Sequence, residues 1–107
     1  MKNTHWEVTT EHGTTYTYTG GSIVIDSKRH GKYSLRSFMG IKAVDRDKLE
    51  QLETTDEMWD FIRESEDVEI PVVGKAMYLS NFSEWRLTTE VVAVETWERV
   101  NNDVDDL

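Results

Sequence analysis

The chain has 107 residues, 37% hydrophobic and 31% charged, which suits one small globular domain and is too short for a two-domain enzyme. Its 12 Lys and Arg against 21 Asp and Glu give a formal net charge of -9, which argues against general affinity for nucleic acid backbones or anionic membranes. Because cysteine is absent, disulfides, thiolate metal sites and cysteine nucleophiles are excluded. With no apolar stretch suited to a secretory signal or a membrane span, we expect a cytoplasmic protein.

The first third of the chain predicts a β-meander. Glu11-His12-Gly13 is suited to a three-residue hairpin loop, and Gly20-Gly21 to a tight turn. These turns set the large apolar side chains of three strands opposite one another on one face, with threonines and charges on the other. The predicted pairs are Val8 with Tyr16, Trp6 with Tyr18, Tyr18 with Ile23, and Tyr16 with Ile25. A fourth strand is predicted over residues 33–38.

The middle of the chain predicts a helical insertion at about residues 45–65. Thr54 followed three places later by Glu57 is a capping box, so a second helix is expected from Thr55 to about Ser65. Its apolar residues form a stripe wide enough to pack on a sheet. They are Met58, Trp59, Phe61 and Ile62.

The last third returns to strand patterns, over residues 68–73, 75–80, 85–89 and 91–100. The run from Val91 to Val94 is apolar on both faces, which predicts a central strand covered by the helices on one side and by sheet on the other. We therefore predict a single α+β domain over residues 1–100, either a curled antiparallel sheet of seven or eight strands or a small β-barrel, with the helices between strands four and five. Residues 101–107 are predicted to be an acidic flexible tail.

Charge is distributed unevenly along the chain. Residues 1–43 hold six Lys and Arg against three Asp and Glu, a balance of +3, whereas residues 44–107 hold six against eighteen, a balance of -12. The functional interpretation is a surface that steers towards a basic partner, and the alternative is a solvated face that keeps the protein soluble. The candidate partner-binding residues are Asp56, Glu57, Asp60, Glu64, Glu66 and Asp67.

A cationic cluster provides an alternative site. Positive side chains on and beside the hairpin of residues 28–36 could contact a nucleic acid or a nucleotide, with one tyrosine available to stack on a base. The field of the acidic half opposes that contact within a Debye length of about 8 Å. The alternative ligand-binding residues are Lys28, Arg29, Lys32, Tyr33 and Arg36.

The remaining patterns favour binding over catalysis. General acid–base catalysis needs two carboxyl groups in environments that separate their pKa values, and no pair in the sequence is marked out in this way. The three histidines are too scattered to suggest a metal site. We therefore expect no enzyme activity, no cofactor and no metal. Trp97, near the end of the last strand, is a candidate interface anchor if it is exposed.

Two segments contain paired threonines in a strand pattern: WEVTTEHGTTYTY, from Trp6 to Tyr18, and Gly74 to Glu95, which ends in WRLTTEVVAVE. These segments resemble parts of small uncharacterised bacteriophage proteins, especially those of actinobacterial hosts. Together they cover about a third of the chain, and Glu90 stands where those proteins usually have proline. The resemblance implies an accessory protein in the cytoplasm of the host cell that acts on a host or defence protein.

These observations predict a small acidic binding protein that engages a basic host or defence protein, with imitation of a nucleic acid as one way of doing so. The first alternative is binding of single-stranded nucleic acid or a nucleotide through the 28–36 hairpin. The second is a virion or assembly component that self-associates through exposed edge strands. Whether the protein is a monomer or a homo-oligomer is left open.

Overall fold

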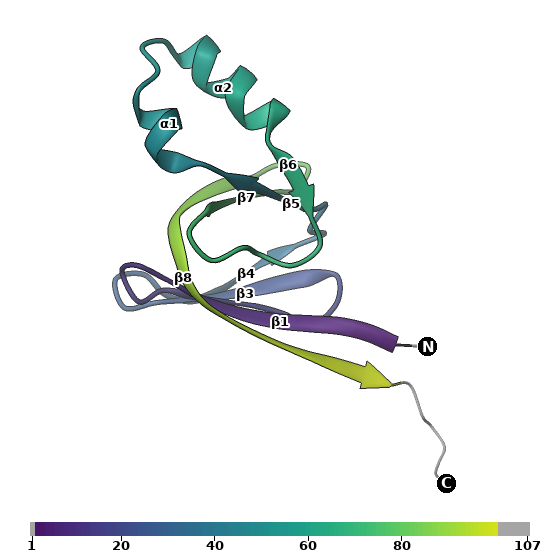
Figure 1. Ribbon diagram of the computed structural model, residues 1–107. Helices are drawn as coiled ribbons and strands as arrows, with labels where there is room; N and C mark the ends of the chain where they lie inside the picture. The colour runs from purple at the N-terminus through teal and green to yellow at the C-terminus, as the bar shows by residue number, and fades with distance from the viewer. Residues whose placement is uncertain (1, 101–107) are drawn as a thin grey trace, which may run out of the picture.

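The computed structural model describes residues 2–100 of the chain and the side chains of residues 4–98. The described residues form eight strands and two short helices (Figure 1). The strands are β1 (Lys2–Thr10), β2 (Thr15–Tyr18), β3 (Ser22–Ser27), β4 (Gly31–Arg36), β5 (Ile41–Val44), β6 (Glu66–Val68), β7 (Ala76–Ser80) and β8 (Trp85–Val100). The helices are α1 (Arg46–Glu50) and α2 (Thr55–Glu64). The predicted acidic tail, residues 101–107, lies outside the described residues.

The strands form one antiparallel sheet in the order β4-β3-β2-β1-β8-β7-β5-β6, which confirms an α+β fold built on an antiparallel sheet. The long strand β8 bends: its first part pairs with β7, and its second part, from Val91 onward, pairs with β1. We call β4, β3, β2, β1 and the second part of β8 sheet 1, and the first part of β8 with β7, β5 and β6 sheet 2. Because β4 and β6 are the two ends of this order, the sheet is open, and the predicted β-barrel alternative is wrong.

The predicted meander register is confirmed. Val8 pairs with Tyr16 and Trp6 with Tyr18, and β3 continues the same face, with Ile23 opposite Tyr18. Both turns contain glycine at positive φ, where other residues are strained, namely Gly13 at 85° and Gly20 at 100°. Short turns and a single apolar face are therefore enough to fix the pairing of these strands.

The main core lies between the two sheets, where β8 folds sheet 2 over sheet 1 (Figure 1). Sheet 1 contributes the apolar face of the meander, and sheet 2 contributes the side chains on its facing side. The buried residues of this core are Trp6, Val8, Tyr16, Ile23, Ile25, Leu35, Ile41, Met77, Leu79 and Val91.

A second core lies on the other face of sheet 2, beneath the helices. Its buried residues are Val44, Leu49, Ile62 and Ala76, with Met58, Trp59, Phe61 and Leu87 among those packed around them. The helices thus cover β5, β7 and the first part of β8. The prediction that they cover the run from Val91 to Val94 is wrong, since Val92 is 52% exposed on the uncovered face of sheet 1.

The capping box that was predicted for the second helix is present. The Thr54 hydroxyl accepts a hydrogen bond from the Glu57 amide at 3.1 Å, and the Glu57 carboxylate accepts one from the Thr54 amide at 3.1 Å. Since both groups would otherwise be unpaired at the helix start, the pair fixes where α2 begins.

Several bounds differ from the sequence prediction: the strand predicted over residues 33–38 is β4, Gly31–Arg36, and the one predicted over residues 68–73 is the short β6, Glu66–Val68. Strand β5 precedes the helices, so the insertion lies between the fifth and sixth strands rather than the fourth and fifth. The predicted strands over 85–89 and 91–100 are one continuous bent strand, β8. Within residues 2–100, neither helix has the length and apolar character needed to cross a bilayer.

Candidate binding surfaces

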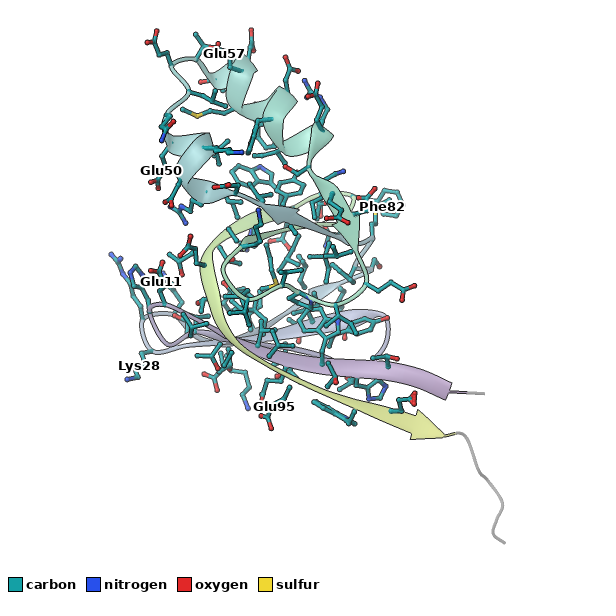
Figure 2. The ribbon with its side chains drawn as sticks, viewed as in Figure 1. Glu11, Lys28, Glu50, Glu57, Phe82 and Glu95 are labelled. Atoms are coloured by element: carbon teal, nitrogen blue, oxygen red, sulfur yellow. The ribbon has the colours of Figure 1, made fainter. Side chains whose placement is uncertain are left out.

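The six predicted acidic residues are all exposed and follow one another along α2 and β6. We call them the acidic surface: Asp56, Glu57, Asp60, Glu64, Glu66 and Asp67. On α2 the acidic side chains lie opposite the apolar stripe that packs on sheet 2, and they extend away from the body of the protein (Figure 2). The structure therefore places four of the six on one solvent-facing side of α2, whereas Glu66 and Asp67, neighbours on β6, are exposed on opposite faces of sheet 2.

Three members of the acidic surface already have partners. Glu57 belongs to the capping box, Asp60 forms an ion pair with Arg63, and Asp67 lies 3.0 Å from the Lys42 ammonium. Asp56, Glu64 and Glu66 form no ion pair with any of residues 4–98. These three carboxylates are the ones most available to an incoming basic group.

Lys42 of β5 ties the end of α2 to sheet 2. Besides its contact with Asp67, its ammonium donates hydrogen bonds to the carbonyls of Arg63 and Ser65, each at 3.2 Å. Those carbonyls lie at the end of the helix, where intrahelical donors run out and a positive charge is favourable. Lys42 therefore holds the end of α2 and the start of β6 against β5.

We expect Lys42→Met to lower the free energy of unfolding by about 1–2 kcal/mol, because it removes the donors but keeps most of the aliphatic stem. Urea unfolding followed by circular dichroism measures the change. Lys28→Met is the matched control, since Lys28 is exposed in the turn between β3 and β4. Equal losses in the two variants would contradict the assigned role of Lys42.

The structure divides the cationic cluster between two faces. Lys28 and Arg29 are exposed in the turn between β3 and β4, and Lys32 and Arg36 are exposed on β4. Tyr33 alternates with them, packs against the main core and has the Arg86 guanidinium 5.8 Å from its ring centroid. A base stacked on Tyr33 would therefore not share a surface with the cations predicted beside it.

Acidic side chains also lie near the cationic ones on sheet 1. Asp26 pairs in register with Lys32, and Glu95 projects from the same sheet (Figure 2). The two edge strands likewise carry exposed charges, Lys32 and Arg36 on β4, and Glu66 on β6. Charged edge strands are typical of sheets that avoid pairing with another chain.

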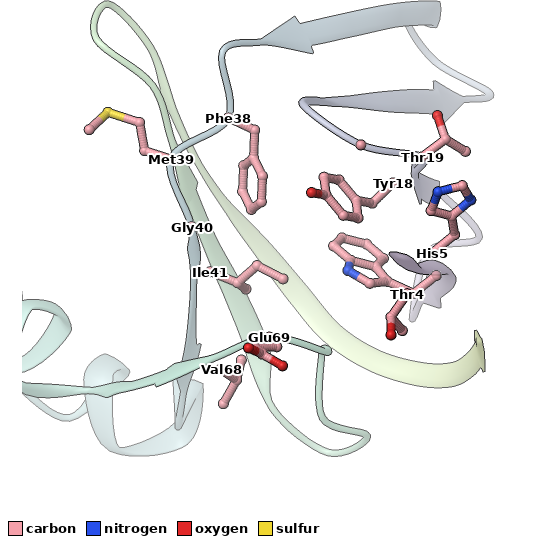
Figure 3. Close-up of a pocket in the computed structure, with 12 residues that line it drawn as sticks. Thr4, His5, Tyr18, Thr19, Phe38, Met39, Gly40, Ile41, Val68 and Glu69 are labelled. Carbon is pink, nitrogen blue, oxygen red and sulfur yellow. The ribbon is translucent and has the colours of Figure 1, made fainter. Parts of the chain in front are cut away.

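A cleft of about 630 Å³ opens between the sheets, a size typical of small-molecule sites. Strand β2 ends at Tyr18, opposite Trp6, while β1 continues to Lys2 and pairs there with β8. Figure 3 shows Tyr18 of sheet 1 near Phe38, with Ile41 and Glu69 on the sheet 2 side. Sequence reasoning missed this cleft, because its walls come from segments whose relation depends on the bend in β8.

The lining of the cleft combines aromatic rings and one carboxylate with the polar side chains of Thr4, His5 and Thr19. The Tyr18 ring is stacked on Trp6, with centroids 5.6 Å apart, and lies 5.7 Å from the Phe38 ring. Glu69 is the only Asp, Glu, Lys or Arg among the described residues that line it. The sequence signals available were the apolar alternation of Trp6 and Tyr18 and the position of Glu69 in an acidic run.

Several aromatic side chains are exposed elsewhere. Trp97 is 43% exposed, and its ring makes an edge contact with buried His5 at 5.9 Å. Trp85 is 51% exposed and lies against Trp59, with ring centroids 5.1 Å apart. The exposure of Trp97 meets the condition set for an interface anchor.

Among the described residues, no three or more His, Asp or Glu side chains are grouped closely enough to hold a metal ion. Comparisons of the chain with protein-family models, curated proteins and solved structures found no match.

Proposed function

We propose that the protein is a non-enzymatic binding protein whose acidic surface engages a basic protein. The observation that carries this proposal is the row of exposed carboxylates along one side of α2, which is followed in the chain by the exposed Glu66 and Asp67 of β6. Asp56, Asp60 and Glu64 are four residues apart and repeat about every 6 Å along the helix axis. Such like-charge neighbours disfavour an isolated helix slightly, while they concentrate negative potential where a basic partner can approach.

The resemblance to phage proteins supports a more specific proposal. In it, the partner is a basic host or defence protein, and the protein acts in the host cytoplasm. The acidic surface would then occupy a groove that normally receives a nucleic acid backbone. Displacement of the partner by duplex DNA would distinguish this mimicry from binding at another basic surface.

The test is capture from lysate of an actinobacterial host, analysed by mass spectrometry after low-salt and high-salt washes. The variant combines Asp56→Lys, Glu64→Lys and Glu66→Lys, which spares the capping box and the Asp60–Arg63 pair. The control combines Glu11→Lys, Asp26→Lys and Glu95→Lys, three exposed carboxylates away from α2. Each triple variant changes the formal charge by +6, from -9 to -3.

A basic partner retained by the wild type and the control, and lost from the acidic-surface variant and in high salt, supports the proposal. Retention by the acidic-surface variant, or equal loss from both triple variants, contradicts it. Circular dichroism of each variant confirms that the fold is intact before capture.

A further inference from the structure

The cleft between the sheets has an aromatic wall. Tyr18 lies between Trp6 and Phe38, with ring planes 27° from the first and 59° from the second. Trp6 is only 1% exposed, whereas Tyr18 and Phe38 are partly exposed, so the latter two rings are the ones a guest can touch. The face of an aromatic ring carries partial negative charge and attracts cations.

The opposite part of the cleft supplies a full negative charge. Glu69 follows β6, is exposed and lines the cleft, and Figure 3 shows its carboxylate beside Ile41, on the side away from Phe38. Val68 is partly buried against the main core and gives the cleft an apolar side, beside the buried Ile41. A guest that matches these groups combines a positive charge with hydrocarbon.

We propose that this cleft binds an organic cation, an ammonium group carried on a short apolar group. The ammonium lies between the Glu69 carboxylate and the rings of Tyr18 and Phe38, while the carbon atoms contact Val68. Anions are disfavoured by Glu69 and by the formal net charge of -9. This site is separate from the acidic surface, because neither Glu69 nor the rings belong to it.

Two sources share this chemistry, a free small amine and the lysine side chain of a protein. The experiment is an NMR titration of the full chain that follows the rings of Tyr18 and Phe38 and the methyl groups of Ile41 and Val68. The cationic probes are choline, n-butylammonium and a lysine blocked at both ends. The uncharged controls are the carbon isostere of choline and n-butanol.

We expect saturable shifts at the cleft residues with at least one cationic probe and much weaker shifts with its uncharged counterpart. Preference for choline or n-butylammonium indicates a free amine, and preference for blocked lysine indicates a protein side chain. Glu69→Gln is expected to weaken cation binding about tenfold, and Phe38→Leu several-fold. Glu66→Gln is the matched control, because it removes an exposed charge from β6 outside the cleft lining.

The proposal is overturned if no cationic probe shifts the cleft residues, or if the uncharged isosteres bind equally well. Equal weakening by Glu69→Gln and Glu66→Gln also overturns it, since that result reflects general charge rather than a site. Phe38 is partly exposed, so Phe38→Leu tests the aromatic wall without opening the core. The acidic-surface triple variant keeps Glu69, so cation binding to it is measured independently of partner capture.

Discussion

Trp6→Ala is expected to lower the free energy of unfolding by about 3–5 kcal/mol. The indole of Trp6 is 1% exposed, belongs to the main core and stacks on Tyr18. Its truncation removes the largest buried side chain between the sheets. The neighbouring strands are held in place by their own hydrogen bonds, so they can move only partly into the cavity that is left. Since the free energy of unfolding of native proteins is only about 5–15 kcal/mol, this one substitution is expected to remove a large fraction of the stability.

Urea unfolding followed by far-UV circular dichroism measures the effect of Trp6→Ala. Phe82→Ala is the control, because Phe82 is 87% exposed in the turn between β7 and β8, and a change within about 0.5 kcal/mol is expected there. A loss below about 1 kcal/mol for Trp6→Ala would show that the two sheets do not depend on this residue for their packing.

The local parts of the fold could be predicted because their signals are local. The meander register follows from two short turns and one apolar face, and the start of α2 follows from Thr54 and Glu57 three residues apart. Neither inference requires knowledge of what lies across the core. The structure confirms both the register and the helix start.

Strand β5 was missed because both of its faces are covered. Ile41 packs towards sheet 1 and Val44 towards the helices, so the four residues Ile41–Val44 show no clean alternation of apolar and polar side chains. Lys42 adds a charge on the helix-facing side, where it serves the end of α2. A short strand with this pattern cannot be separated from a helix start by periodicity alone.

The candidate sites divide in the same way. Exposure of the acidic surface could be predicted, because carboxylates opposite an apolar stripe must face solvent. Strand alternation alone places Tyr33 on the opposite face of β4 from Lys32 and Arg36, so the separation of the cationic cluster could also have been predicted. The cleft could not be predicted, since Tyr18, Phe38 and Glu69 come together only through the long-range pairing of β8.

The bend in β8 depends on an irregular pairing with β7. Ala76 pairs with Glu90 and Tyr78 with Leu87, so Met77 faces two residues of β8, which is the arrangement of a β-bulge. Backbone groups at a bulge lose their regular partners and must find others. Here the buried Thr88 hydroxyl accepts a hydrogen bond from the Met77 amide at 2.9 Å, and Arg46 donates to the Thr88 carbonyl at 2.8 Å.

Thr88→Val is therefore expected to lower the free energy of unfolding by about 1–3 kcal/mol, because it keeps the shape of the side chain and leaves the buried Met77 amide without its acceptor. Thr88→Ser keeps the hydroxyl and should cost less than half as much. Urea unfolding gives both values, and amide hydrogen exchange at Met77 should accelerate in Thr88→Val alone. If valine and serine are equally tolerated, the hydroxyl does not stabilise the bulge, and the bend that brings the two sheets together must rest on packing at Val91 and Leu79.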